Sequence, residues 1–196
     1  MAVDEAEILQ LVVRERQVRD RGWWDELPGC YHPEATIRTS WFSGTIAEYV
    51  ERSKDMHTSD PSTHRVGVPV VRAHGDRSVV ELPMTIEFRG DVRGVECDLA
   101  VQIRFITRVE RRDGTWRILS SEAVFEHDTL TPTMPGSAPK VTSEDLAGFR
   151  PSYRMLALWL TERGYEVGDD RLGADRPEAV EQVYREAHAW AGLTAH

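Results

Sequence analysis

The spacing of apolar residues predicts an N-terminal helix over residues 4–20. Apolar side chains recur there every three to four residues, and acidic residues stand in the first turn, where the helix dipole favours them. Gly22 marks the end of this helix. A second, short helix is expected over residues 23–31, interrupted by Pro28 and Gly29. The chain therefore opens with helices, and its first strand is expected afterwards.

A strand and a third helix follow. The β-branched and aromatic residues of segment 36–42 predict the strand. Thr45 has Glu48 three residues after it, which is the spacing of a capping box at the start of a helix. Apolar residues at helical spacing continue as far as Met56. A single strand is thus expected between the N-terminal helices.

From His64 onward the pattern changes to the two-residue alternation that is typical of strands. The pairs Gly75-Asp76 and Asp113-Gly114 are turn signals, and the second is a strong signal for a hairpin. Residues 89–97 are interpreted as a loop or the end of a hairpin. Four segments are expected to form strands: 64–74, 78–88, 99–109 and 116–125.

This order of elements predicts an α+β fold, in which the N-terminal helices pack on one face of a curved antiparallel sheet. The sheet-bearing domain is expected to cover residues 1–128. Residues 129–143 contain three prolines and are interpreted as an extended linker. Residues 144–196 are expected to form a C-terminal helical extension. Its helices are predicted from about residue 143 to 163 and from 177 to 190, the latter capped by Asp175.

Composition narrows the possible partners. The chain has 33 acidic and 24 basic residues and a net charge of −9, which argues against a nucleic-acid-binding protein. The N-terminus lacks the basic start and apolar run of a signal peptide, and no window approaches the ~20 apolar residues of a membrane span. Cys30 and Cys97 have no CxxC spacing and are interpreted as buried free thiols, with a disulfide between them as the alternative. We therefore expect a cytoplasmic protein that does not interact with membranes.

Motifs for metals and nucleotide cofactors are absent from the sequence. The histidines do not occur with HxxxH or HxH spacing, and neither GxGxxG nor GxxxxGK[ST] is present. The serines lack the context of a nucleophile elbow. The sequence therefore predicts neither a metal nor a cofactor.

Three phrases carry a resemblance to a known family: RDRGWWDELPGCYHPEATI, THRVGVPVVRAHGDRSVVE and VERRDGTWRILSSEAVFEHD. In this order and at these separations the chain resembles the SnoaL-like branch of the nuclear transport factor 2-like superfamily over about residues 5–128. The resemblance implies a cone-shaped α+β barrel. The superfamily contains scytalone dehydratase, bile acid dehydratase, hexachlorocyclohexane dehydrochlorinase, polyketide cyclases, ketosteroid isomerase and many non-catalytic members. Fold alone therefore leaves the function open.

The same resemblance implies a catalytic pair. In the dehydratase-like members an aspartate at the end of the first helix faces a histidine at the start of a long strand, and the matching residues are Asp20 and His64. An imidazole oriented by a carboxylate is an effective base near neutral pH. The chain departs from those enzymes at residues 14–16, where Arg-Glu-Arg replaces their tyrosine. Without the resemblance, the sequence favours a simpler interpretation, in which Asp20 lies at the end of a helix on the surface and His64 begins a strand at a loop.

Eight further residues are expected to line a pocket. Strand alternation places Val66 and Val68 on the face of His64, so that they would continue an apolar lining. Trp41 and Trp116 are alternatively ordinary core residues, and Ser120 and Glu122 alternatively lie at an exposed rim. The predicted set is Trp24, Trp41, Val66, Val68, Trp116, Ile118, Ser120 and Glu122.

The resemblance thus implies a cofactor-independent lyase or isomerase of the dehydratase or cyclase type. It would act on a small apolar substrate, such as a polyketide- or steroid-like compound, in an enclosed cavity. The alternatives are a non-catalytic protein that binds a small ligand in the same cavity, or an assembly scaffold. A homodimer is expected by analogy with the superfamily. The C-terminal helices are expected either to pack on the core or to cover the cavity mouth or a partner subunit.

Overall fold

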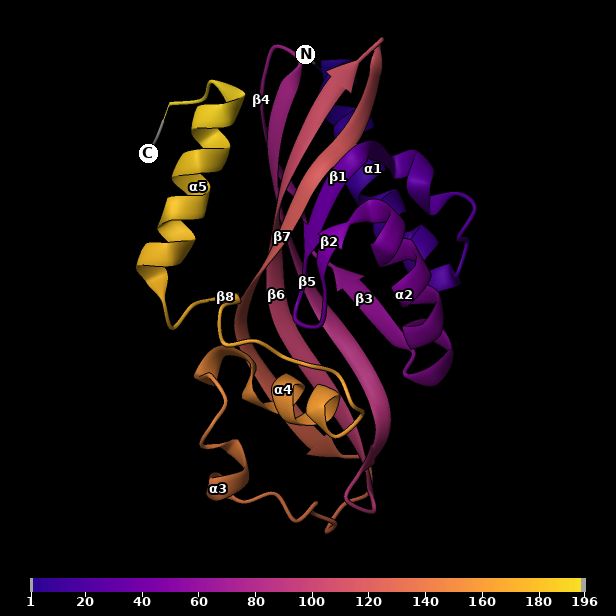
Figure 1. The fold of residues 1–196 in the computed structure, drawn as a ribbon, viewed down its shortest axis with the longest axis vertical. Coiled ribbons are helices and arrows are strands. Elements are labelled where there is room, and N and C mark those ends of the chain that lie inside the picture. The colour runs from indigo at the N-terminus through magenta and orange to yellow at the C-terminus, as the bar shows by residue number, and fades with distance from the viewer. Residues whose placement is uncertain (1, 195–196) are drawn as a thin grey trace.

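A computed structural model, which describes residues 2–194, contains one open, curved sheet of eight strands (Figure 1). The main path of the sheet runs in the order β2-β1-β7-β6-β5-β3, while β4 pairs with β5 and β8 with β7. Helices α1 and α2 lie on one side of this sheet and α5 on the other (Figure 1). The predicted α+β class is confirmed.

Long strands make up the centre of the sheet and pair antiparallel, as expected. Two neighbours of β7 depart from that expectation, since β1 and β8 run parallel to it. The two register shifts in the β6–β7 pair each place one extra residue in β7, as β-bulges do, and the β1–β7 pairing is interrupted between Tyr31 and Thr36. The strands are β1 (Tyr31–Arg38), β2 (Ser43–Thr45), β3 (Ser62–Val66), β4 (Val70–His74), β5 (Arg77–Val92), β6 (Val95–Arg112), β7 (Thr115–Pro132) and β8 (Leu172–Gly173).

The two long N-terminal helices, α1 (Ala2–Arg21) and α2 (Ile46–Ser59), form where the pattern predicts them. The predicted capping box is present: Glu48 Oε2 accepts from Thr45 N at 3.0 Å, and Thr45 Oγ1 accepts from Glu48 N at 3.4 Å. The helix expected over residues 23–31 is wrong for most of its length. Only a 3-10 turn, Leu27–Cys30, forms there, because Pro28 would lie inside a helix over residues 23–31, where it removes a backbone hydrogen bond, and Gly29 has a low helix propensity.

The strand expected over residues 64–74 is interrupted between β3 and β4. Gly67 approaches the β5 backbone there, and its N–H donates to Pro83 O at 2.8 Å. A Cβ atom at Gly67 would come within 3.1 Å of the Pro83 ring. Residues 67–69 lie between β3 and β4, outside both strands, and the exposed Val68 does not continue the face of His64.

Hairpin turns join the long strands. Asp113 and Gly114 both have positive φ, at 51° and 76°, which confirms the predicted turn. A second turn of this kind, at Arg93 and Gly94, closes the β5–β6 hairpin where a longer loop was expected. Arg93 adopts this conformation with its guanidinium bound to Asp145 at 2.7 Å, an ion pair that the local sequence does not signal.

The C-terminal segment begins within the sheet, since the predicted boundary at residue 128 lies inside β7. Residues 129–132 continue that strand. The helix predicted over 143–163 is divided by Pro151 into α3 (Ser143–Leu146), a 3-10 turn (Pro151–Tyr153) and α4 (Arg154–Thr161). The final helix, α5 (Pro177–Ala191), forms as predicted.

Asp175 does not cap α5, contrary to the prediction. Its carboxylate binds the guanidinium of Arg150 at 2.6 and 2.9 Å and accepts from the hydroxyl of Ser152. Arg176 is the residue that precedes the helix, and its side chain makes no capping hydrogen bond. Asp175 thus joins the start of α5 to the turn before α4.

Helix α4 packs into the main core. The Leu156 N–H donates to Asp128 Oδ2 at 2.8 Å, and Trp159 Nε1 donates to Asp60 Oδ2 at 2.8 Å. Leu156, Trp159 and Leu160 are buried among the residues of the sheet. The C-terminal segment therefore completes the core that the N-terminal helices and the sheet begin.

Helix α5 covers part of the opposite face of the sheet (Figure 1). Val79, Ile106 and Val124 project from three neighbouring strands and are buried with apolar residues of the helix, which include Val180 and Ala187. This second, smaller cluster lies outside the main core.

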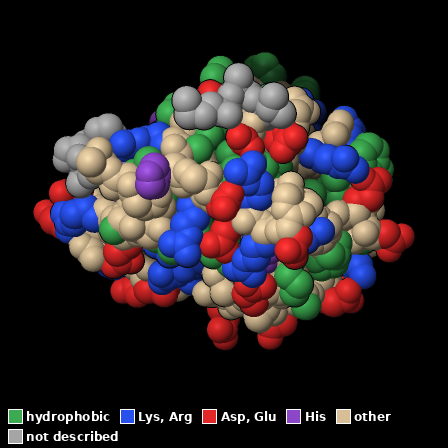
Figure 2. All heavy atoms as spheres, turned by 90° about the horizontal axis from the view of Figure 1, so that it is seen from above, with side chains coloured by type: hydrophobic (Ala, Val, Ile, Leu, Met, Phe, Trp, Pro, Cys, Tyr) green, Lys and Arg blue, Asp and Glu red, His purple; other side chains and the backbone are tan. Residues whose placement is uncertain are grey.

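Charges of both signs are interspersed on the surface that Figure 2 shows. Among the helices of residues 2–194, none combines the length and the apolar character that crossing a membrane requires.

We predict that Ala187→Asp destabilises the fold by about 3 kcal/mol or more, because it buries an unpaired carboxylate between α5 and the sheet. Ala187 is only 1% exposed. Urea denaturation measures the change in the free energy of unfolding. Ala179→Asp, at an exposed position of the same helix, is the matched control and is expected to change it little. Equal effects of the two substitutions would contradict the packing of α5 described above.

Candidate active site

The last turn of α1 meets the middle of β3 through Asp20 and His64. Asp20 Oδ1 lies 2.6 Å from His64 Nδ1, and Asp20 Oδ2 accepts from the His64 backbone N–H at 2.7 Å. Both side chains are largely buried, with exposed fractions of 13% and 5%. The structure thus brings together the two residues singled out from the sequence.

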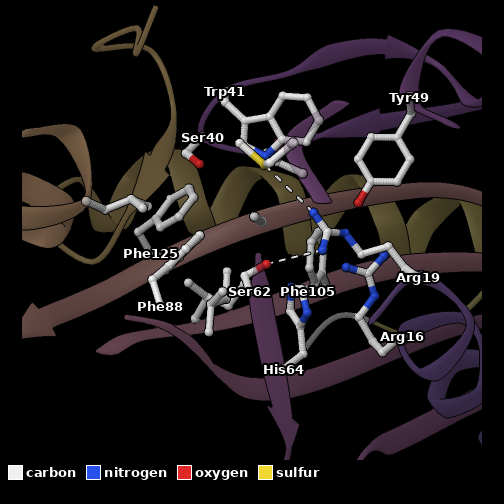
Figure 3. A pocket seen from close by; sticks show the side chains of 16 residues that line it. Arg16, Arg19, Ser40, Trp41, Tyr49, Ser62, His64, Phe88, Phe105 and Phe125 are labelled. Atoms are coloured by element: carbon white, nitrogen blue, oxygen red, sulfur yellow. Dashed lines mark hydrogen bonds between the residues drawn. The ribbon is translucent and has the colours of Figure 1, made fainter. Parts of the chain in front are cut away.

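The carboxylate determines which ring nitrogen of His64 carries the proton. An ionised carboxylate only accepts hydrogen bonds, so Nδ1 carries the proton and donates to Asp20. Nε2, on the other side of the ring, then keeps a free lone pair in the neutral imidazole. Figure 3 shows the His64 ring rising from β3 into a cavity that it helps to line.

Burial keeps this imidazole neutral. It lowers the pKa of His64 to about 4, and the positive charges of Arg16 and Arg19 act in the same direction against the opposing effect of Asp20. Burial by itself would raise the pKa of Asp20, but hydrogen bonds from the His64 ring and backbone outweigh it and the pKa is lowered. At neutral pH the pair is therefore a carboxylate beside a neutral imidazole.

The cavity lies between α1, α2 and the concave face of the sheet, and α4 contributes one residue to it (Figure 3). Its free space, about 30 Å³ for the centres of water molecules, is enough for about two waters. Most of its walls are apolar. The lining residues are Arg16, Arg19, Thr39, Ser40, Trp41, Tyr49, Met56, Ser62, His64, Ile86, Phe88, Ile103, Phe105, Ala123, Phe125 and Leu156.

Two buried arginines from α1 enter this apolar cavity, and the first of them has an acidic partner. Arg16 is ion-paired with Glu15, and its guanidinium lies 5.2 Å from the centre of the Phe105 ring. Glu15 also accepts from the hydroxyl of Tyr31 at 2.6 Å. The charge of Arg16 is therefore matched where it is buried.

Arg19, one turn further along, is held by neutral groups. Nη1 donates to Ser62 Oγ at 3.2 Å, and Nη2 donates to the sulfur of Met56 at 3.8 Å (Figure 3). Asp20 Oδ1 lies 3.9 Å from Nη1, beyond hydrogen-bond distance. Among the described residues, neither Arg19 Nε nor Thr39 Oγ1 has a hydrogen-bond partner, although both atoms are buried.

Of the eight residues predicted to line the pocket, the structure places Trp41 in this cavity, where its ring stacks on Tyr49. Val66 is partly buried against the core but lies outside the cavity. Val68 is 83% exposed, because it lies in the segment that joins β3 to β4. Trp24 borders a separate surface depression and packs edge-on against His57.

The predicted residues of the last long strand lie elsewhere as well. Trp116 is buried beneath the start of α1 and donates to Asp4 Oδ1 at 3.2 Å. Ile118 borders a smaller internal space next to this cavity. Ser120 and Glu122 border a different depression, where Glu122 binds Arg38 at 3.1 Å. The first β-bulge of β7 lies between Ile118 and Ser120, so Ser121 and Ala123 are buried after it and simple alternation misplaces Ser120 and Glu122.

Sequence reasoning missed Arg19 as a cavity residue and noted Arg16 only as a departure from a family pattern. A signal was available in the helix periodicity. Ile8, Val12, Arg16 and Arg19 follow one another at spacings of four, four and three, and all are buried. The apolar stripe of α1 therefore continues into two arginines at the level of the cavity.

Metal binding and disulfide formation have less support within the described residues. They contain no group of three or more His, Cys, Asp or Glu side chains that could hold a metal ion. Cys30 and Cys97 are buried free thiols.

Comparison with known proteins identifies the fold family. The SnoaL-like domain matches residues 1–122. Pea pathogenicity protein 2 of the fungus Fusarium vanettenii is 28% identical over 97% of this chain and 86% of its own length. A PEP2-like protein from the same fungus is 30% identical over 88% of this chain and 78% of its own length.

Solved structures share the fold at low sequence identity. A hexachlorocyclohexane dehydrochlorinase (LinA, type 2) superposes with a TM-score of 0.58 at 12% identity, over 71% of this chain and 97% of its own. A candidate scytalone dehydratase from Novosphingobium aromaticivorans gives a TM-score of 0.56 at 14% identity, over 70% and 96% of the two chains. Since the SnoaL-like domain spans 122 of the 196 residues, the chain belongs to the SnoaL-like domain family.

Proposed function

We propose that this chain is a lyase or isomerase in which His64 transfers a proton and Asp20 orients it. The observation that carries the proposal is the arrangement of the ring: Nδ1 is bound by Asp20, and the ring lines a largely apolar cavity. A neutral imidazole in this position accepts a proton through Nε2, and the carboxylate then stabilises the imidazolium that forms.

The proposed step needs only proton transfer. His64 Nε2 removes a proton from a carbon next to a carbonyl group, and the electron pair of the C–H bond forms a carbon–carbon double bond. In an elimination, the leaving group departs from the adjacent carbon with its electron pair. In an isomerisation, the new double bond joins the acidic carbon to the carbonyl carbon, and the carbonyl electron pair moves to oxygen to give an enolate. The imidazolium then returns the proton to the far carbon of a C=C bond conjugated with this enolate, the carbonyl group forms again, and the C=C bond has moved. Both outcomes use the pair Asp20 and His64 without a cofactor.

The family supports this class of reaction. SnoaL-like and related folds include dehydratases and isomerases, and two of the structural neighbours are named for eliminations. The tyrosine that those dehydratases place before the aspartate is replaced here by residues 14–16. Tyr49, from α2, instead places a phenol ring in the cavity wall. We propose that Tyr49 supplies a polar contact to the substrate.

The cavity walls support a small, largely apolar substrate. Trp41, Phe88, Phe105 and Phe125 provide aromatic surface, but the free space of about 30 Å³ is far smaller than a polycyclic molecule. We propose a polyketide- or steroid-like compound as the substrate. Such a molecule enters the cavity only if the side chains of the wall move apart. Residues 1–128 would form the catalytic part, and residues 144–196 would form an extension that closes it through Leu156.

Two further properties remain proposals. The free, buried thiols of Cys30 and Cys97 support a reducing compartment such as the cytoplasm. A homodimer is proposed by analogy with the superfamily, whose members often pair through an apolar sheet face. Helix α5 covers part of that face here, so a dimer would use another part of the surface.

We predict that Asp20→Asn and His64→Gln each lower turnover by about 10²- to 10⁴-fold, the usual contribution of general acid–base catalysis. One assay follows the consumption of small carbonyl compounds that carry a leaving group on the β-carbon, next to the acidic α-carbon. A second assay follows the exchange of the α-proton for deuterium from the solvent. Asp25→Asn and His74→Gln, at exposed positions, are the controls and are expected to retain activity. Full turnover by His64→Gln would exclude His64 as the base, whereas binding without any turnover by the wild-type protein would favour the non-catalytic binding protein.

A second prediction concerns pH. The pKa of His64 is about 4 in the folded chain and about 6.5 in the unfolded chain, so between these pH values the unfolded chain binds more protons. Stability therefore falls as the pH falls from 6.5 to 4, and this one group contributes roughly 3 kcal/mol over that window. Asp20, whose pKa is lowered by folding, acts in the same direction at still lower pH.

Urea denaturation at pH 7 and pH 4.5 measures the free energy of unfolding at each pH. The difference between the two values is expected to be smaller for His64→Gln than for the wild-type protein. NMR titration of the His64 ring tests the same point directly. A ring that titrates in the ordinary range, near pH 6.5, would contradict the buried neutral imidazole.

A further inference from the structure

The charges in the cavity are not evenly compensated. Arg16 and Arg19 stand one helical turn apart, and both are more than nine-tenths buried. Glu15 is ion-paired with the first. Asp20 is the nearest carboxylate to the second, at 3.9 Å, but both of its oxygens already accept hydrogen bonds from His64. The cavity thus contains a buried guanidinium without a hydrogen-bonded anion.

Such a guanidinium is costly unless a ligand completes its hydrogen bonds. The acceptors of Arg19, a serine hydroxyl and a methionine sulfur, are both neutral, and its Nε has no partner among the described residues. Thr39 Oγ1, in the same cavity wall, also lacks one. A buried charge and unsatisfied donors both cost free energy, and a carboxylate provides acceptors that match the planar fork of arginine.

We propose that the cavity recognises a compact carboxylic acid, whose carboxylate binds Arg19 and Thr39 beside Arg16. This deepens the proposed function and rests on it for the reaction, but not for binding. As a substrate, the acid would carry a separate carbonyl group, such as a ketone, next to the reacting C–H bond, because an ionised carboxylate acidifies that bond very little. The apolar walls would contact the rest of the molecule, and the small free space favours a short chain.

Binding of a carboxylate would also make His64 a stronger base. The groups that act on its ring are Asp20, which raises its pKa, and Arg16 and Arg19, which lower it. A bound anion offsets the two positive charges, so the imidazole accepts a proton more readily when the ligand is present. Recognition of the carboxylate and activation of the base are thus linked through the same two arginines.

The test compares butanoate with butanamide, which has a similar shape but no charge. Binding is measured by NMR titration of the 196-residue chain. We expect wild type to bind butanoate at least about tenfold more tightly, as for a hydrogen bond to a charged group. Butanoate, but not butanamide, is expected to raise the pKa of the His64 ring, a response that a merely structural role of Arg19 would not produce.

Variants separate the charge of Arg19 from its role in folding. Arg19→Gln is expected to lose the preference for butanoate, and Arg19→Lys, which keeps the charge, to retain part of it. Asp20→Asn removes the carboxylate near Arg19 and is expected to strengthen butanoate binding while it lowers turnover. Arg14→Gln is the matched control, since this exposed residue of the same helix pairs with Glu26 outside the cavity.

The proposal is overturned if butanoate fails to bind or binds no better than butanamide. It is also overturned if Arg19→Gln keeps the preference, or if Asp20→Asn weakens butanoate binding. A wild-type preference for butanoate together with full turnover by His64→Gln would support the carboxylate site and refute only the proposed catalytic role.

Discussion

The contact between Asp20 and His64 is the interaction on which the rest of the candidate site depends. It joins the last turn of α1 to β3, residues 44 positions apart in the chain, through one side-chain and one backbone hydrogen bond. Because both groups are largely buried, the carboxylate selects the tautomer of the ring. The contact therefore determines where the helix end meets the sheet and which nitrogen is available for chemistry.

Charge then distinguishes this cavity from a purely apolar one. The same helix that carries Asp20 also brings Arg16 and Arg19 into a space with mostly aromatic and aliphatic walls. In such surroundings charges interact more strongly than in water, so the arginines affect both the ligand and the basicity of His64. The proposed chemistry and the proposed recognition of a carboxylate follow from this single turn of α1.

The C-terminal segment contributes to both faces of the sheet. Leu156 of α4 reaches the cavity, and Trp159 is hydrogen-bonded to Asp60 at the end of α2. On the other face, α5 buries an apolar cluster from β5, β6 and β7. The residues beyond the matched SnoaL-like region thus help to close the cavity and to cover the sheet.

The sequence by itself determined the elements whose signals are local: α1 and α2 with its capping box, the alternating strands, the Asp113-Gly114 turn and α5. The resemblance also selected Asp20 and His64. Tertiary structure decided the pocket wall, because the segment between β3 and β4 and the β-bulges of β7 redirect side chains that strict alternation would point inward. It also decided that Arg19 is buried without a hydrogen-bonded acidic partner, since that depends on neighbours supplied by α2 and β3, which are distant in the chain.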